Sequence, residues 1–197
     1  MPTEIFNERL LYPSYEIIGG EKIMAPAPNL THSNIIGRLY LFIGNYLMAN
    51  KSGYVYSDNV DVHFSDGTLF KPDLCVVLKS NEKILAGQQN IFGAPDMVVE
   101  VLSKSTKKRD VTIKKDTYEL NGVKEYWIVD PYMEIVDVYL LKDGKYYLDG
   151  EYILYNEDEW EMLTDEQRAE NKTEITLATF PDLTIKLSDI FYDRKWR

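Results

Sequence analysis

Short apolar runs rich in valine, isoleucine and aromatic residues recur along this chain of 197 residues, and polar or glycine-containing segments separate them. Runs of this kind predict strands. They lie at residues 15–18 and 22–24, which flank a Gly19-Gly20 turn, and at residues 54–64, 74–78, 97–102, 125–130, 135–141, 145–156 and 183–187. The pattern therefore predicts a protein built largely on strands, with a second hairpin turn at residues 142–145.

Two segments instead carry apolar residues at the spacing of an α-helix. The first begins at Thr31, a suitable N-cap, and extends to about Met48, and Gly53 is expected to end it. Its predicted buried face consists of Ile35, Ile36, Leu39, Phe42, Ile43, Tyr46 and Leu47. The second helix covers about residues 108–121, and Gly122 follows it at the position where glycine closes helices.

An acidic, polar segment at about residues 156–172 interrupts the strand pattern. Within it, the run from Thr164 to Gln167 fits a capping box and predicts a short, exposed helix. No repeat, low-complexity tract or linker divides the sequence. We therefore expect one domain over residues 1–197, with the acidic segment as an insert.

The composition is that of a folded protein without a membrane segment. Hydrophobic residues make up 45% of the chain, and no apolar run approaches the roughly twenty residues that a membrane helix needs. The N-terminus lacks the basic start and apolar middle of a signal peptide. The lone Cys75 is expected to pack as a small hydrophobic residue in a reducing compartment. We therefore expect a soluble, cytoplasmic protein.

The net charge of −10 counts against a general nucleic-acid binder, because phosphate contacts need lysine and arginine. A local basic site is still compatible with this total. The cationic side chains gather in one segment, at Lys104, Lys107, Lys108, Arg109, Lys114 and Lys115. Such a run is either a solvated helix face or a surface that receives a phosphate backbone.

Two acids lie in apolar, strand-like surroundings, Asp73 after Pro72 and Glu100 within Met-Val-Val-Glu-Val-Leu. A buried acid is unfavourable unless it is paired, hydrogen-bonded or bound to a cation. Alternation places Glu100 on the same strand face as Val98 and Leu102. The two acids together predict a site for a divalent metal such as Mg2+, which takes oxygen ligands. The alternative is that each acid caps a turn or pairs with a surface lysine.

Lys114 is expected to share a helix face with Asp110 and Tyr118, one turn away on either side. Alone, this spacing is explained by an Asp–Lys pair within the helix. No zinc-ligand spacing, dinucleotide or phosphate loop, or serine-hydrolase elbow is found in the sequence.

Several segments in combination carry a family resemblance. They are Tyr15-Glu16-Ile17-Ile18, Gly20-Glu21, Met24-Ala25-Pro26, His32, Pro72-Asp73, the run from Gly93 to Ser103, Asp110, Lys114, Tyr118, Gly122-Val123 and the run from Glu125 to Pro131. Together they resemble the Uma-two family of restriction-endonuclease-like proteins, in the PD-(D/E)xK nuclease superfamily. This resemblance implies an α/β fold with a mixed β-sheet core flanked by helices, and a metal-dependent nuclease site at the sheet edge.

The resemblance also assigns roles. Asp73 and Glu100 would be the catalytic acids that hold Mg2+ or Mn2+. The superfamily's lysine usually lies two residues past the second acid, where this chain has Leu102, so Lys114 from the following helix would replace it. Glu21 could add a carboxylate, and His32 could bind phosphate or support the acids.

The implied activity is endonucleolytic hydrolysis of DNA, with Lys107, Lys108 and Arg109 receiving the backbone. Cutting both strands with one site in each chain implies a homodimer. The main alternative is a catalytically inactive binding or assembly module that keeps the nuclease fold, which the net acidity and the displaced lysine favour. A glycosidase that uses the two acids as acid and base is a further alternative, for which the sequence shows no sugar cleft.

Overall fold

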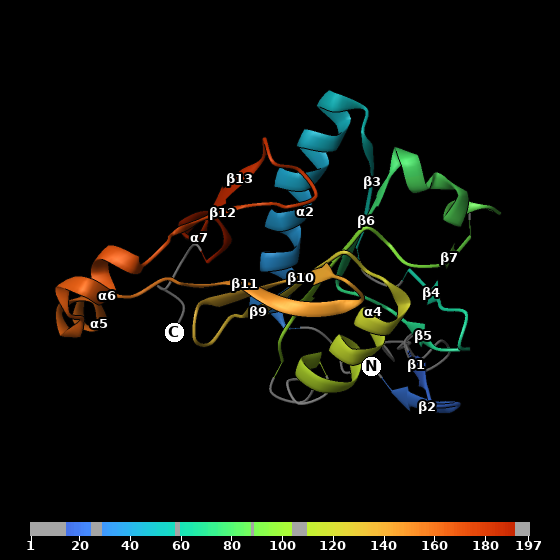
Figure 1. Ribbon diagram of the computed structural model, residues 1–197, viewed down its shortest axis with the longest axis horizontal. Coiled ribbons are helices and arrows are strands. Elements are labelled where there is room, and N and C mark those ends of the chain that lie inside the picture. The colour runs from blue at the N-terminus through green and yellow to red at the C-terminus, as the bar shows by residue number, and fades with distance from the viewer. Residues whose placement is uncertain (1–14, 25–28, 58–59, 88, 104–109, 192–197) are drawn as a thin grey trace, which may run out of the picture.

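The computed structural model describes residues 15–24, 29–57, 60–87, 89–103 and 110–191. A six-stranded mixed sheet lies at their centre, in the order β11-β10-β9-β8-β6-β3 (Figure 1). Its strands are β3 (Gly53–Ser57), β6 (Leu74–Leu78), β8 (Met97–Val101), β9 (Glu125–Asp130), β10 (Ile135–Lys142) and β11 (Lys145–Ile153). Within this sheet β8 and β9 are parallel, and the other neighbouring pairs are antiparallel.

Successive side chains of the central strands point to opposite faces of this sheet. Val99 and Trp127 belong to one hydrophobic core, whereas Val98 and Ile128 belong to a second. Every residue of β8 and β9 is buried, as expected for parallel strands covered on both faces. The continuous apolar runs of the sequence therefore correspond to the strands between the two cores.

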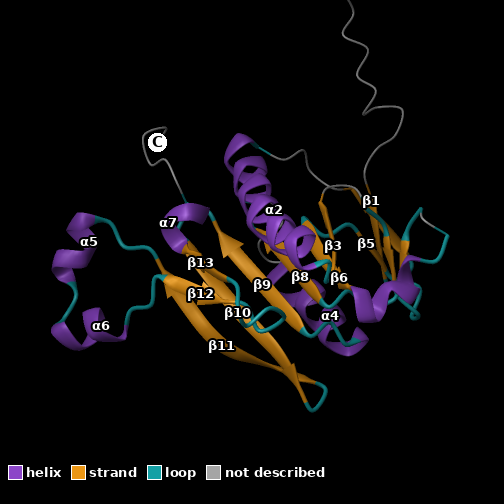
Figure 2. Ribbon diagram, turned by 90° about the horizontal axis from the view of Figure 1, so that it is seen from above, coloured by secondary structure: helices purple, strands orange, loops and turns teal. Residues whose placement is uncertain are grey.

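Helix α2 (Leu30–Asn50) covers the first face of the sheet (Figure 2). Its predicted buried face is confirmed except at Phe42, which is 36% exposed, and at Tyr46, which packs against the core but is only partly buried. The predicted ends are wrong. Asn29, not Thr31, is the N-cap, and its side chain accepts a hydrogen bond from the backbone N–H of His32 at 2.9 Å. Lys51 is the C-cap, in the left-handed conformation with φ of 51°.

Gly53 does not end the helix but begins β3. A Cβ at this position would lie 2.5 Å from the carbonyl oxygen of Val77 on the neighbouring strand. Real Cβ atoms essentially never approach backbone so closely. The glycine therefore allows β3 to pair closely with β6.

A smaller sheet covers the second face, in the order β2-β1-β5-β4-β7. Its strands are β1 (Tyr15–Ile18), β2 (Glu21–Met24), β4 (Val62–His63), β5 (Leu69–Phe70) and β7 (Ile91–Phe92). The β1–β2 hairpin was predicted. The single strand predicted over residues 54–64 is wrong, because β3 pairs with β6 whereas β4 pairs with β5 and β7 in the other sheet. A 3-10 helix that the sequence did not predict, η1 (Lys79–Leu85), follows β6.

The parallel pair of β8 and β9 requires a crossover connection, which passes over the second face. Its described part consists of a π-helical turn, η2 (Asp110–Lys114), and helix α4 (Lys115–Asn121). Gly122 closes α4 with φ of 85°, as predicted. Residues 104–109, which include the predicted start of this helix, lie outside the described residues.

The C-terminal part returns to the α2 side of the sheet. A short hairpin, β12 (Glu174–Thr176) and β13 (Thr184–Lys186), leads into helix α7 (Leu187–Ile190). Ile175 and Ile185 of the hairpin belong to the first core. The predicted strand at residues 183–187 is confirmed in its centre, whereas its partner β12 and helix α7 were missed.

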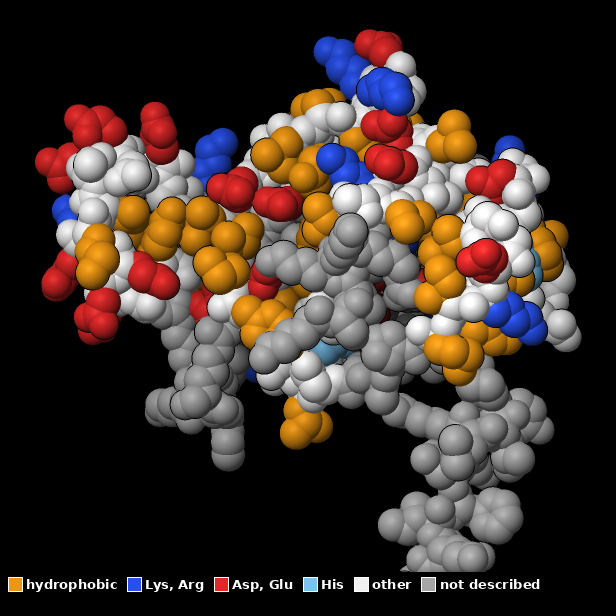
Figure 3. All heavy atoms as spheres, turned by 90° about the horizontal axis from the view of Figure 1, so that it is seen from below, with side chains coloured by type: hydrophobic (Ala, Val, Ile, Leu, Met, Phe, Trp, Pro, Cys, Tyr) orange, Lys and Arg blue, Asp and Glu red, His pale blue; other side chains and the backbone are white. Residues whose placement is uncertain are grey.

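The acidic insert forms two short helices, α5 (Glu157–Met162) and α6 (Asp165–Glu170), at one end of the molecule (Figure 1). The predicted capping box at α6 is confirmed by reciprocal hydrogen bonds between Thr164 and Gln167. Neither helix buries a residue, and Figure 3 shows acidic side chains distributed around this end. Among the described residues, no helix is long and apolar enough to span a membrane.

Candidate active site

Asp73 and Glu100 meet at one end of the central sheet. In the antiparallel pair of β6 and β8, Leu74 lies opposite Val99. Continuing this register by one residue places Asp73 opposite Glu100. Two acids that are distant in the sequence are therefore neighbours across two strands.

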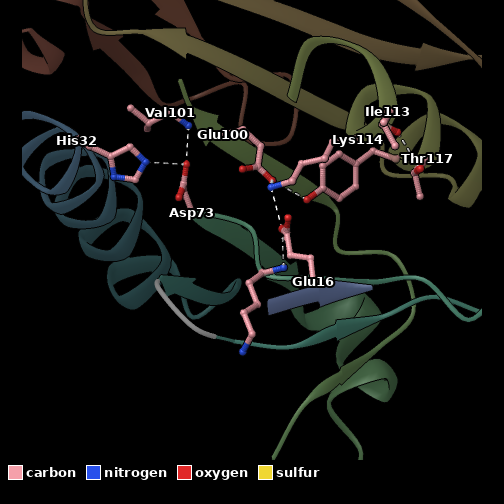
Figure 4. A network of polar contacts seen from close by, with 10 residues as sticks. Glu16, His32, Asp73, Glu100, Val101, Ile113, Lys114 and Thr117 are labelled. Atoms are coloured by element: carbon pink, nitrogen blue, oxygen red, sulfur yellow. Dashed lines mark hydrogen bonds and ion pairs between the residues drawn. The ribbon is translucent and has the colours of Figure 1, made fainter. Parts of the chain in front are cut away.

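Asp73 uses one of its carboxylate oxygens to bind the protein. Oδ2 accepts a hydrogen bond from the backbone N–H of Val101 at 2.7 Å and lies 3.1 Å from Nε2 of His32 (Figure 4). Within the described part of the chain, no donor contacts Oδ1, and the side chain is 21% exposed. One oxygen is thus fixed, and the other remains available to a ligand.

Glu100 is 2% exposed and lies on the face of β8 that was predicted, toward the second core. Its Oε1 accepts hydrogen bonds from Nζ of Lys114 at 2.9 Å and from the hydroxyl of Tyr118 at 2.7 Å. Burial and the neighbouring Glu100 carboxylate hold the pKa of Tyr118 well above its usual range. The tyrosine therefore stays protonated and continues to donate to Glu100.

Lys114 comes from the crossover rather than from the strand that carries Glu100. It is the last residue of η2 and is 3% exposed. Because Tyr118 lies one helical turn later, both side chains reach the same oxygen of Glu100, as their predicted common face requires. π-helical turns are often found at functional sites, where they alter the direction of one side chain. The side chain of Asp110 lies outside the described residues, so the alternative of an Asp110–Lys114 pair is not addressed.

A second buried carboxylate, Glu16 of β1, also binds Lys114. Its Oε1 lies 2.9 Å from Nζ of Lys114 and accepts the backbone N–H of Lys71 at 3.3 Å. Glu16 is 1% exposed. The ammonium group thus lies between Glu16 and Glu100, at 2.9 Å from each (Figure 4).

Among the described residues, the acidic side chains of this cluster outnumber the basic ones. Glu16, Asp73 and Glu100 supply three carboxyl groups, and Lys114 supplies one amine. His32, which contacts Asp73, adds a positive charge only when it is protonated. Because a buried carboxylate is favourable when it is paired or bound to a cation, this set of side chains is compatible with a cation next to the partly exposed Asp73.

The donor set fits a hard divalent cation that is shared with other ligands. Mg2+ is commonly held by one or two carboxylates, with water and substrate phosphate completing its coordination. Asp73 and Glu100 would supply the two carboxylates. Among the described residues, no three His, Cys, Asp or Glu side chains lie close enough to hold a metal by themselves, so a closed protein cage is not what these residues form.

The other residues selected from the sequence are placed as follows. His32, in the first turn of α2, contacts Asp73 and so lies where it can support an acid. Glu21 is exposed beside the hairpin turn, opposite Ile18, and the structure does not bring it into the cluster. The three basic residues Lys107, Lys108 and Arg109 lie outside the described residues.

Sequence reasoning did not select Glu16 or Tyr118 as site residues. For Glu16 the available signal was a charged residue within a four-residue apolar strand. Its location depends on the pairing of Ile17 with Leu69, which is a long-range contact. For Tyr118 the signal was its spacing of one helical turn from Lys114.

A solved structure shares the fold. It is the crystal structure of a protein from Anabaena variabilis ATCC 29413, described as a putative nuclease belonging to DUF820. The TM-score is 0.69 at 20% sequence identity, over 91% of this chain and 90% of that chain. This likeness confirms the predicted fold class, a mixed sheet flanked by helices. A comparison with curated protein sequences gives no match.

A family model matches residues 7–185 of the sequence. This range contains all five residues of the cluster, which are Glu16, His32, Asp73, Glu100 and Lys114. The model is described as "Putative restriction endonuclease" and covers most of the chain. The chain therefore belongs to the Uma2 family.

Proposed function

We propose that this chain is a metal-dependent endonuclease that hydrolyses DNA phosphodiester bonds. The observation that carries the proposal is the arrangement of Asp73, Glu100 and Lys114 at one end of the sheet, with two acids opposite each other and an ammonium group 2.9 Å from the second acid. The descriptions of the family, "Putative restriction endonuclease", and of the structural neighbour, "putative nuclease", support the same class of activity.

Four residues of the cluster would each have a distinct part in the reaction. Asp73 and Glu100 would hold a divalent cation such as Mg2+ or Mn2+, which supplies an activated water and stabilises charge on the phosphoryl group. His32 and the N–H of Val101 orient Asp73 through Oδ2. Lys114 orients Glu100 and provides a positive charge near the developing negative charge.

Nucleic acid would approach the partly exposed Asp73. The basic segment that contains Lys107, Lys108 and Arg109 follows the Glu100 strand directly in the sequence. We propose that these residues bind the phosphate backbone, which the net charge of −10 would otherwise repel. A dimer of this chain would place two such sites on the two strands of a duplex.

Cleavage of supercoiled plasmid DNA tests the proposal. We expect nicked and linear products with Mg2+ or Mn2+, and none with a chelator. Asp73→Asn and Glu100→Gln, which preserve side-chain size, should each lower the rate at least ~100-fold, because a metal ligand is removed. Glu119→Gln is the matched control. Glu119 on α4 also pairs with a lysine, Lys145, but lies away from the site, so the substitution removes the same charge without touching the acids.

Two outcomes would separate the alternatives. If the wild-type protein cleaves neither DNA nor a structured RNA but binds Mn2+ through Glu100, the chain is a binding module that retains the nuclease fold. If it cleaves and the Asp73→Asn and Glu100→Gln proteins cleave equally well, the assignment of this site is wrong. A parallel digestion of RNA decides the substrate class, and sedimentation measures the dimer.

A further inference from the structure

Glu16 is the buried carboxylate of the cluster to which the proposed reaction gives no part. Its Oε1 binds Nζ of Lys114 at 2.9 Å, the same distance as that between Nζ and Oε1 of Glu100. The side chains of Glu16, Lys114 and Glu100 are at most 4% exposed. Two buried carboxylates therefore share one ammonium group.

A backbone hydrogen bond and a strand pairing place Glu16 next to the segment that carries Asp73. The backbone N–H of Lys71 donates to the same oxygen of Glu16 at 3.3 Å, and only Pro72 separates Lys71 from Asp73. The pairing of Ile17 with Leu69 fixes the strand that carries Glu16 next to this segment. Glu16 therefore links the segment of Asp73 to the helix of Lys114.

We infer that Glu16 is a positioning residue that draws the Lys114 ammonium group away from Glu100 and so keeps Glu100 able to bind a divalent cation. This inference rests on the metal site of the proposed function. A lysine bound to Glu100 alone would neutralise that carboxylate and compete with a cation for it. A second carboxylate at the same distance weakens the interaction of the ammonium group with Glu100, because the group then donates to both carboxylates.

The geometry favours this role over direct metal ligation. The oxygen of Glu16 that contacts Lys114 also accepts a backbone N–H, and the ammonium group lies between Glu16 and Glu100. Among the described residues, Glu16 does not form a group of three metal-binding side chains with Asp73 and Glu100. Glu16 therefore acts on the cation through Lys114.

Calorimetric titration of the folded full-length protein with Mn2+ tests this role without measuring activity. Glu16→Gln removes the charge, and Glu16→Asp keeps the charge but shortens the side chain so that it no longer reaches Lys114. We expect both to weaken Mn2+ binding about tenfold, as the loss of a residue that orients a metal ligand does. Glu119→Gln, which breaks the ion pair between Glu119 of α4 and Lys145 of β11, should change the affinity less than about twofold.

Lys114→Gln completes a double-mutant cycle, because its amide can still donate to a carboxylate but carries no charge. We expect the fold-loss in Mn2+ affinity that Glu16→Gln causes to be at least about threefold smaller in the Lys114→Gln background than in the wild type. An undiminished effect would mean that Glu16 contacts the metal itself. Wild-type affinity in Glu16→Asp would mean that charge alone matters, and either result overturns the inference.

Failure of this inference differs from failure of the proposed function. If wild-type protein binds Mn2+ and Glu16→Gln binds it equally well, Glu16 has no positioning role, while the metal site stands. If wild-type protein binds no Mn2+, the metal dependence of the proposed reaction and the role of Glu16 are both wrong.

Discussion

The backbone N–H of Val101 donates a hydrogen bond to Oδ2 of Asp73 at 2.7 Å. Asp73 lies just before β6, at the end of the backbone hydrogen-bond ladder between β6 and β8. Its carboxylate therefore takes the place of a backbone acceptor for the residue that follows Glu100. The same bond that extends the β6–β8 pairing by one residue fixes the spacing of the two acids.

Asp73→Asn and Asp73→Ala should separate these two roles. Asparagine retains an oxygen that can accept from Val101, whereas alanine leaves that N–H without its partner. We expect Asp73→Ala to lower the free energy of unfolding by about 1–3 kcal/mol more than Asp73→Asn does. Both should lose Mn2+ binding. Thermal unfolding and calorimetry measure the two effects, and equal stability of the variants would contradict the structural role of the bond.

His32 should affect the metal site through Asp73. Its Nε2 lies 3.1 Å from Oδ2, so His32→Leu removes a contact that orients the acid. We expect a 10- to 100-fold loss in Mn2+ affinity or cleavage rate, the usual range for residues that orient a ligand (about one to two orders of magnitude). The chain has a second histidine, His63, which contacts Asn90 and stacks on Phe92. His63→Leu is the matched control, and a similar loss in it would contradict a specific role for His32.

The central strands could be predicted because their information is local. The runs at Val98 and Trp127 are apolar on both faces, which is how strands between two cores appear in a sequence. The sequence also placed Glu100 on the same strand face as Val98 and Leu102, and the structure agrees. The antiparallel pairing of β6 with β8, which sets Asp73 opposite Glu100, was not predicted.

The remaining parts depend on contacts that the sequence does not show locally. The N-cap of α2 could be Asn29 or Thr31, and both residue types are suitable, so only the backbone decides. Glu16 enters the site through a pairing with a segment about fifty residues away. The π-helical turn that ends at Lys114 departs from the regular helical spacing on which the prediction rested.

Tyr118→Phe should lower the stability more than Tyr146→Phe, which removes the hydroxyl of a partly buried tyrosine. Tyr118 donates to the Glu100 carboxylate, whereas Tyr146 donates to the neutral carbonyl of Val123 at 2.8 Å. Hydrogen bonds to charged groups contribute about 1.5–3 kcal/mol, compared with about 0.5–1.5 kcal/mol for neutral ones. We therefore expect Tyr118→Phe to lower the free energy of unfolding, measured with denaturant, more than Tyr146→Phe does.

The same two variants should differ in cleavage. Tyr118→Phe loosens Glu100 and should lower the rate of plasmid nicking, while Tyr146→Phe, away from the acids, should leave it unchanged. If Tyr146→Phe lowers both stability and rate as much as Tyr118→Phe, the effects reflect the core in general rather than the bond to Glu100.

Cys75 should make the protein less stable as the pH rises above about 9. The thiol is buried, as expected from its apolar run, and burial, with a smaller effect of Glu100, raises its pKa to about 12. In the unfolded chain it ionises near its ordinary value of 9.0. Its contribution to stability is therefore fully present below pH 9 and is lost progressively between pH 9 and about 12.

Cys75→Ala isolates this contribution, because the small cavity that it leaves lowers stability equally at every pH. Between pH 8 and pH 10, we expect the wild type to lose about 1.4 kcal/mol more of its unfolding free energy than Cys75→Ala does. Tyr118, whose pKa is also raised, contributes mainly above this window, since an unfolded tyrosine ionises near pH 10. Equal losses in denaturant titrations, or rapid reaction of the native thiol with a disulfide reagent at pH 8, would contradict the buried, protonated state of Cys75.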